Sequence, residues 1–190
     1  MIEENEYDPP ITYPTKLHKG RYCPVCAEEA VSPLGSTDND YLIIEEFPYA
    51  MLTPKRTSFN RNEIFPQSIL QLELDKVGML LGKFRFVSVF PHFSHENGDP
   101  NANCYASGLA RAVDEINGKK GVIILGANLC KEFTGYELKK VCGLSYVDTK
   151  YMPDGDVPRV FLPSIDTIYS TGAGEFGLGL MRFAKQIGVI

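Results

Sequence analysis

A six-residue apolar run, GVIILG at 121–126, constrains the fold of this chain more than any other feature. A strand with one solvated face alternates apolar and polar residues, so a run without polar side chains predicts a strand covered on both faces. Such strands lie at the centre of parallel sheets. Three other short β-rich stretches predict its neighbours: YLII (41–44), KFRFVSVF (83–90) and VPRVFLP (157–163).

Helical stretches separate these strands. Pro66 occupies a first-turn position and begins a helix of about 14 residues. A second helix, CYASGLARAVDEINGK, carries an apolar stripe made of Leu109, Ala112, Val113 and Ile116. ANLCKEFTG predicts a short helix, and GEFGLGLMRFAKQI a terminal one at 174–187. Strands and helices in alternation predict an α/β fold, a three-layer αβα sandwich with a short, mostly parallel four-stranded central sheet.

The 190 residues are enough for one domain with its own core. Residues 1–40 are rich in proline, glycine, aspartate and serine and predict an irregular N-terminal arm, part of the same domain as residues 41–190. The N-terminus is acidic where a signal peptide would be basic, and no apolar run has the length of a membrane span. We therefore expect a soluble, intracellular protein of the cytoplasm with no membrane partner.

The net charge of −5 neither indicates nor excludes nucleic-acid binding, because a local basic patch matters more than the sum. Four basic clusters are present, of which any one can also be solvated surface. They comprise Lys16, His18, Lys19 and Arg21; Lys55, Arg56 and Arg61; Lys119 and Lys120; and Lys139 and Lys140.

Two adjacent carboxylates, Glu45 and Glu46, end the first predicted strand. Ligands of open α/β sheets bind at the carboxyl ends of the strands, so this pair is a candidate for chemistry. Adjacent strand residues point to opposite faces, and only one of the two can therefore serve a given site. The alternative interpretation is a solvated strand end.

Five cysteines, an odd number, and a reducing compartment argue against disulfides. Cys23 and Cys26 form a Cys-x2-Cys pair in RYCPVC, a spacing typical of a metal knuckle. One such pair supplies only half of a metal site, and two further ligands must come from elsewhere in the chain.

The order of these elements and several local strings resemble the uracil-DNA glycosylase superfamily, in particular its iron–sulfur branch (family 4). That branch shows Cys-x2-Cys near the N-terminus, Gly-Glu-x-Pro-Gly after a strand, and Pro-Phe. It continues with Asn-Val-Val-Lys-Cys, a cysteine opening a helix, Leu-Gly-Ala after a strand, and His-Pro-Ser. The resemblance covers roughly residues 20–187 and runs through degenerate versions of each string.

The resemblance implies roles for residues after the first strand. EEFP places Glu46 at the glutamate of the family motif, where a carboxylate orients or deprotonates water for attack on the sugar C1′. Pro48-Tyr49 copies the Pro-Tyr of family 1 enzymes, in which the tyrosine limits the size of the base pocket. Phe59 falls at the family's Pro-Phe aromatic, which stacks on a flipped base; the alternative is a loop-anchoring core residue.

The resemblance also completes the metal set. The third cluster ligand falls on His92 and the fourth on Cys104, which together with the knuckle would make a Cys3His site. Such a set suits structural zinc at least as well as a 4Fe-4S cluster, which usually takes four thiolates. Cys130 or Cys142 could replace the histidine and restore four cysteines. A protein with no metal remains the third alternative.

Three departures from the family argue against efficient uracil excision. The base-reading asparagine is Ser88, whose hydroxyl cannot reproduce the donors and acceptor of an amide. The late His-Pro-Ser reads Leu162-Pro163-Ser164, and leucine donates nothing to a developing oxyanion. Both glycines of the first motif are replaced, by Glu45 and Tyr49.

The resemblance also implies that the family's contacts to DNA phosphates have counterparts in this chain. Pro163 and Ser164 would present a hydroxyl and a backbone amide to a phosphate, and STGAGEFG (170–177) leads into a helix N-terminus. The sequence thus predicts a DNA-binding protein acting on duplex or single-stranded DNA. It is either a glycosylase for a damaged or modified pyrimidine or a catalytically silent accessory of replication or transcription. A third hypothesis is a flavodoxin-like nucleotide-binding domain. Against it, the chain has no Gly-x-Gly-x-x-Gly or P-loop after the first strand.

Overall fold

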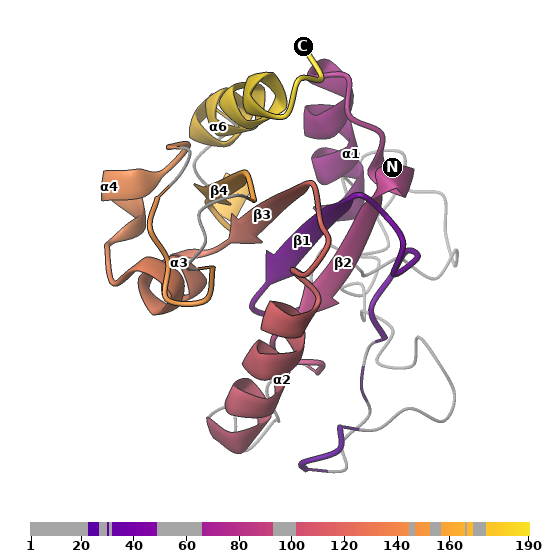
Figure 1. Ribbon diagram of the computed structural model, residues 1–190, viewed down its shortest axis with the longest axis vertical. Helices are drawn as coiled ribbons and strands as arrows, with labels where there is room; N and C mark the ends of the chain where they lie inside the picture. The colour runs from indigo at the N-terminus through magenta and orange to yellow at the C-terminus, as the bar shows by residue number, and fades with distance from the viewer. Residues whose placement is uncertain are drawn as a thin grey trace, which may run out of the picture.

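The computed structural model of the chain is shown in Figure 1. It describes residues 23–26, 30, 32–48, 66–92, 102–144, 147–152, 157–165, 167–168 and 174–190.

Four parallel strands form the sheet. They are β1 (Tyr41–Glu45), β2 (Phe84–Ser88), β3 (Gly121–Leu125) and β4 (Arg159–Leu162), in the spatial order β2-β1-β3-β4. All five residues of β3 are buried, and the strand lies between β1 and β4, so the prediction of a central strand from the apolar run is confirmed. The α/β class with a four-stranded parallel sheet is likewise confirmed.

The helices are α1 (Pro66–Lys76), α2 (Ala102–Asp114), α3 (Ala127–Thr134), α4 (Leu138–Val141) and α6 (Gly174–Gln186), with a 3-10 turn, η1, at Leu81–Lys83. The first helix begins at Pro66 as predicted and is 11 residues long, shorter than expected. Gly135 ends α3 in the left-handed conformation, with φ of 78°. The sequence did not predict α4 or η1.

Helices cover both faces of the sheet (Figure 1). On one face, α1 and α6 pack against the sheet through one buried cluster that includes Leu70, Leu74, Phe176 and Phe183. On the other face, α2 and α3 pack through a second cluster, to which the predicted stripe contributes Leu109 and Ala112 of α2 and Ile116 from the turn after it. Alternate strand residues supply the two clusters, as a pleated strand buried on both sides requires.

Residues 34–39 of the N-terminal arm lie along the outer edge of the sheet. Leu34 and Phe86 exchange backbone hydrogen bonds of 3.1 and 2.9 Å in an antiparallel bridge. The Asn39 side chain donates to the carbonyl of Phe84 at 2.8 Å. These bonds satisfy part of the edge of β2 that would otherwise be open to another strand. Among the described residues, no helix has both the length and the apolar character needed to cross a membrane.

The strand order creates a switch point. From β1 the chain leads to β2 on one side, and the later strand β3 pairs with β1 on the other side. The connections therefore diverge where β1 and β3 end, and open parallel sheets bind ligands in the resulting crevice.

Candidate metal centre and switch-point pocket

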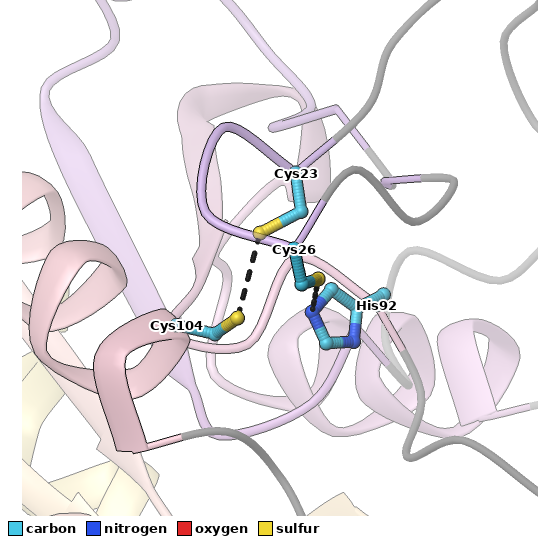
Figure 2. Close-up of side chains that lie close together, drawn as sticks. All are labelled: Cys23, Cys26, His92 and Cys104. Atoms are coloured by element: carbon cyan, nitrogen blue, oxygen red, sulfur yellow. Dashed lines mark hydrogen bonds between the residues drawn. The ribbon is translucent and has the colours of Figure 1, made fainter.

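Four side chains expected to bind a metal lie together in space (Figure 2). The Sγ atoms of Cys23 and Cys104 are 3.7 Å apart, and the Sγ of Cys26 is 3.3 Å from Nε2 of His92. All four ligand atoms lie within 4.8 Å of one another. We call this set the Cys3His cluster; its chemistry and spacing are those of a site that could hold a metal.

Three separate segments build the Cys3His cluster. The turn 23–26 supplies two thiols, His92 follows the end of β2, and Cys104 lies in the first turn of α2. A close approach of helix and strand makes this possible, because a Cβ on Gly108 would lie only 1.7 Å from the carbonyl oxygen of Val89. Only glycine allows α2 to pack this near the segment that leads to the histidine.

The two remaining cysteines are not part of the cluster. Cys130 is buried in α3, where its Sγ contacts the hydroxyl of Thr134 and the carbonyl of Tyr136. Cys142 lines a pocket at the carboxyl ends of β1, β3 and β4. The structure therefore brings together the set with His92 and not the all-cysteine alternative.

The thiols of the cluster differ in how readily they ionise. Burial opposes ionisation of Cys23, but hydrogen bonds from the backbone amides of Cys26 and Val25 outweigh it, so the pKa of Cys23 lies below the ordinary value. Burial, followed by hydrogen bonds with Cys26 and Cys23, raises the pKa of Cys104 to about 12. Three thiols this close cannot all carry charge without a cation between them, which is the condition that a bound metal meets.

A half-buried arginine lies beside the cluster. The Nη2 of Arg111 donates to the carbonyl of Ser88 at 3.0 Å, and its guanidinium is attracted electrostatically to Cys23. Burial lowers the pKa of Arg111, and the charges of Glu115 and Cys23 act in the opposite direction. A divalent ion with three thiolates and a neutral imidazole carries a net charge of −1, which this guanidinium is placed to offset.

A pocket of about 800 Å³ lies at the carboxyl ends of β1, β3 and β4. Residues after each strand line it, including Glu46, Asn128, Pro163 and Ser164. The pocket occupies the switch point and has a volume suited to a small ligand. Among the described lining residues, the charged ones are three glutamates and one lysine, which are Glu45, Glu46, Glu175 and Lys139.

The two carboxylates after β1 have different environments. Glu45 is 4% exposed, whereas Glu46 is only partly buried and faces the pocket mouth. The Nδ2 of Asn128 donates to both carboxylate oxygens of Glu46, at 3.0 Å each. Glu46 is thus the member of the pair that combines access to water with a fixed orientation.

Other residues named from the sequence occupy varied positions. Pro163 and Ser164 line the pocket, and the hydroxyl of Ser164 shares a hydrogen bond of 2.8 Å with that of Thr167. Ser88 is 2% exposed, pairs in register with Glu45, and does not line the pocket. Leu162 is fully buried in the core on the side of α1 and α6. Tyr49 and Phe59 lie outside the described residues.

A second, shallower hollow of about 500 Å³ lies on the other side of the Glu46–Asn128 pair. Tyr105, Lys131 and Lys150 line it. Burial, then the negative charges of Glu132 and Glu46, raises the pKa of Tyr105 to about 12. The carboxylate of Glu46 therefore forms part of the wall between two hollows.

Sequence reasoning missed two residues that shape these sites, Asn128 and Arg111. Asn128 is the third residue after β3, so the strand-end rule that selected Glu46 would also have selected it. No local pattern marks Arg111, because its role comes from a hydrogen bond to the carbonyl of Ser88 and an electrostatic interaction with Cys23.

Neither the protein families nor the curated proteins compared with this chain contain a match: no family model fits it, and no curated protein is significantly similar.

Proposed function

We propose that this chain is a DNA-binding protein of the uracil-DNA glycosylase superfamily, which hydrolyses the N-glycosidic bond of a damaged or modified pyrimidine nucleotide. The observation that carries the proposal is the Glu46 carboxylate, which lies at the mouth of the switch-point pocket and is oriented there by Asn128. The position matches that of the water-handling carboxylate in the motif that EEFP resembles.

The proposed reaction requires a water molecule oriented for attack on C1′ and a pocket that accommodates the modified base. Glu46 accepts a hydrogen bond from the water whose oxygen forms a bond to C1′, and takes up the proton as that bond forms. Before this attack, the bond from C1′ to the base nitrogen breaks, and its electron pair leaves with the base, which then takes up a proton from solvent while Glu46 later releases its own. Glutamates on the pocket wall favour the cation-like sugar that develops between these events.

A catalytically silent binding protein is the second candidate, and the positions of Ser88 and Leu162 favour it. Both are buried, and neither lines the pocket. The family's asparagine and histidine at these places read uracil and stabilise its departing charge, and the buried serine and leucine supply no equivalent donors. A silent protein would hold DNA, or a replication or transcription partner, without excising a base.

For the Cys3His cluster we infer a single structural zinc ion in place of a 4Fe-4S cluster. Zn–S bonds of about 2.3 Å put neighbouring tetrahedral sulfurs about 3.8 Å apart, and Cys23 and Cys104 have their Sγ atoms 3.7 Å apart. Ligands of a cubane bind four different iron atoms and must stand further apart than ligands of one ion. The zinc would cross-link the arm, the end of β2 and α2, and it takes no part in the hydrolysis.

Single-turnover excision assays test the proposed reaction. The substrates are duplex and single-stranded oligonucleotides that carry uracil or 5-hydroxymethyluracil, and oligonucleotides with the purines hypoxanthine and xanthine test whether excision is confined to pyrimidines. Glu46→Gln keeps the shape of the side chain and removes its charge, so we expect it to lower the excision rate by roughly 10² to 10⁴-fold. Glu175→Gln is the comparison, because it removes one charge from the same pocket wall and leaves the Glu46–Asn128 pair intact, so its rate should fall much less than that of Glu46→Gln.

DNA binding is measured on the same variants at several salt concentrations. Glu46→Gln should bind DNA at least as tightly as the unchanged protein, because it removes a negative charge near the phosphates. No excision of any base, together with salt-sensitive DNA binding, would support the silent protein. Absence of both excision and DNA binding would contradict the glycosylase and would leave only a protein partner for the silent candidate.

A further inference from the structure

We infer that the Cys3His cluster positions Glu46, and that Phe90 is the residue through which it does so. A metal in the cluster sets the geometry of the turn 46–48, so metal occupancy controls the site at the pocket mouth. The functional meaning of this coupling rests on the role proposed above for Glu46. The physical coupling itself stands on contacts between the two sites.

The first contact runs through the backbone. The pairing of β1 and β2 continues beyond the assigned strands, because the amide of Val89 donates to the carbonyl of Glu45 at 2.9 Å. The amide of Phe90 donates to the carbonyl of Glu46 at 2.8 Å. The main chain of Glu46 is therefore bonded to a residue only two positions before His92, a cluster residue.

The second contact runs through side chains. The rings of Phe47 and Phe90 stack with centroids 4.9 Å apart and an interplanar angle of 14°. Phe90 is 4% exposed and shares one buried cluster with Cys23 and Cys104. One ring thus contacts both the turn that carries Glu46 and the side chains that would hold the metal.

The third contact comes from α2. Tyr105 follows Cys104 directly, and its ring centroid lies 5.3 Å from that of Phe90. Tyr105 also lines the shallower hollow together with Glu46. Helix α2, which supplies the ligand Cys104, therefore also packs against the Phe90 ring.

A metal bound by the Cys3His cluster would cross-link the turn 23–26, the segment that ends at His92, and helix α2. With an ion bound, three segments that meet around Phe90 become one rigid unit, because each ligand fixes its own backbone. Without it, the turn 23–26 loses its cross-link to His92 and Cys104, and the sulfur contacts of 3.7 Å to Cys104 and 3.3 Å to His92 are weak by comparison with metal–ligand bonds. Phe90 then becomes more mobile. The turn 46–48 becomes more mobile with it, because the Phe47 ring stacks on Phe90 and the Glu46 carbonyl accepts a hydrogen bond from the Phe90 amide.

Hydrogen exchange on the full chain tests the coupling without any substrate. The zinc-loaded protein is compared with the same protein after chelation and after reloading with Zn²⁺. We expect exchange of the Val89 and Phe90 amides to accelerate about tenfold on chelation, as expected for the loss of an ordinary hydrogen bond, and to recover on reloading. Peptides from α1 and α6, on the opposite face of the sheet, should keep their protection.

A variant separates the coupling from the metal itself. Phe90→Leu leaves all four ligands in place, so we expect one zinc per chain. It removes the stacked ring, so residues 46–48 should exchange faster even in the zinc-loaded protein. Phe86→Leu is the matched control, because it makes the same change four residues earlier, within β2, on the side of α1 and α6. If excision is detected, Phe90→Leu should lower kcat more than it raises KM, since the pocket residues that follow β3 and β4 are unchanged.

Two results would overturn the inference. Identical exchange of residues 45–48 and 88–92 in the loaded and chelated proteins would show that the cluster and Glu46 are independent. Equal acceleration in α1 and α6 would show that the metal holds the whole fold and has no special relation to Glu46. An inactive protein that still shows the local effect would contradict the proposed function and leave the coupling intact.

Discussion

Asn128 donates its side-chain amide to both carboxylate oxygens of Glu46, at 3.0 Å each, across the crevice between the ends of β3 and β1. The two residues are 82 positions apart in the chain. Their contact orients a partly exposed carboxylate at the pocket mouth and separates the pocket from the shallower hollow beside Tyr105.

Replacing Asn128 with alanine should release the Glu46 carboxylate. Small displacements of a catalytic group cost up to about 10²-fold in rate, and we expect a loss of that order in single-turnover excision. The free energy of unfolding should change by less than about 1 kcal/mol, because the lost hydrogen bond is exposed. Asn117→Ala, in an exposed turn, is the control. An unchanged excision rate would show that Asn128 does not orient Glu46.

Replacing Cys26 with serine should remove the metal. Serine is a poor zinc ligand, so the content should fall from one zinc ion per chain to near zero, as measured by elemental analysis of purified protein. Cys142→Ser, which changes a cysteine outside the cluster, should keep the zinc. Iron and sulfide with a broad visible absorption band in the unchanged protein would contradict the zinc assignment.

Replacing Arg111 with leucine should weaken metal binding without removing a ligand. Groups next to metal ligands typically contribute 10–100-fold to affinity, and we expect a loss of about that size in competition with a chromogenic chelator. Arg182→Leu changes an arginine on α6, away from the cluster, and controls for the loss of a surface charge. Equal affinities in both variants would show that Arg111 does not offset the charge of the cluster.

Replacing Leu162 with histidine, the residue of the resembling motif, should destabilise the protein and restore no activity. Leu162 is fully buried in the apolar core, and its Cδ2 would lie 2.2 Å from a Cβ on Gly179. Burying an unpaired polar ring there should lower the free energy of unfolding by about 3 kcal/mol in urea titrations. Leu162→Met should cost less than about 1.5 kcal/mol. A stable, more active histidine variant would place this side chain in the pocket.

Tyr151 should make stability fall at high pH. Its hydrogen bond with Glu132, followed by burial, raises the pKa of Tyr151 to about 12 in the folded protein. An unfolded tyrosine ionises near pH 10. Between these values the unfolded chain binds fewer protons than the folded one, so the free energy of unfolding decreases as pH rises. Tyr151→Phe should show a shallower decrease between pH 9 and 11 in urea titrations. Parallel curves for both proteins would contradict the assignment.

Several elements were predictable because their signals are local. The apolar run at 121–126 predicted β3, Pro66 predicted the start of α1, and Gly135 predicted the end of α3. Helix α4 escaped prediction because four residues carry too little periodicity to be distinguished from a turn. The predicted strand 83–90 was longer than β2, which ends at Ser88. Beyond Ser88, the amides of Val89 and Phe90 bond to the carbonyls of Glu45 and Glu46, where β1 passes into a turn.

By itself, the sequence determined the alternation of strands and helices, the central apolar strand and half of a metal site at Cys23 and Cys26. These are properties of neighbouring residues, and short-range periodicity and spacing are enough to express them. Tertiary structure decided which distant groups meet. His92 and Cys104 join the knuckle because β2 lies beside β1 and α2 packs closely on its end, and Asn128 reaches Glu46 because β3 pairs with β1 on the other side. Strand order and close packing are set by the burial of the whole core, which no single segment encodes.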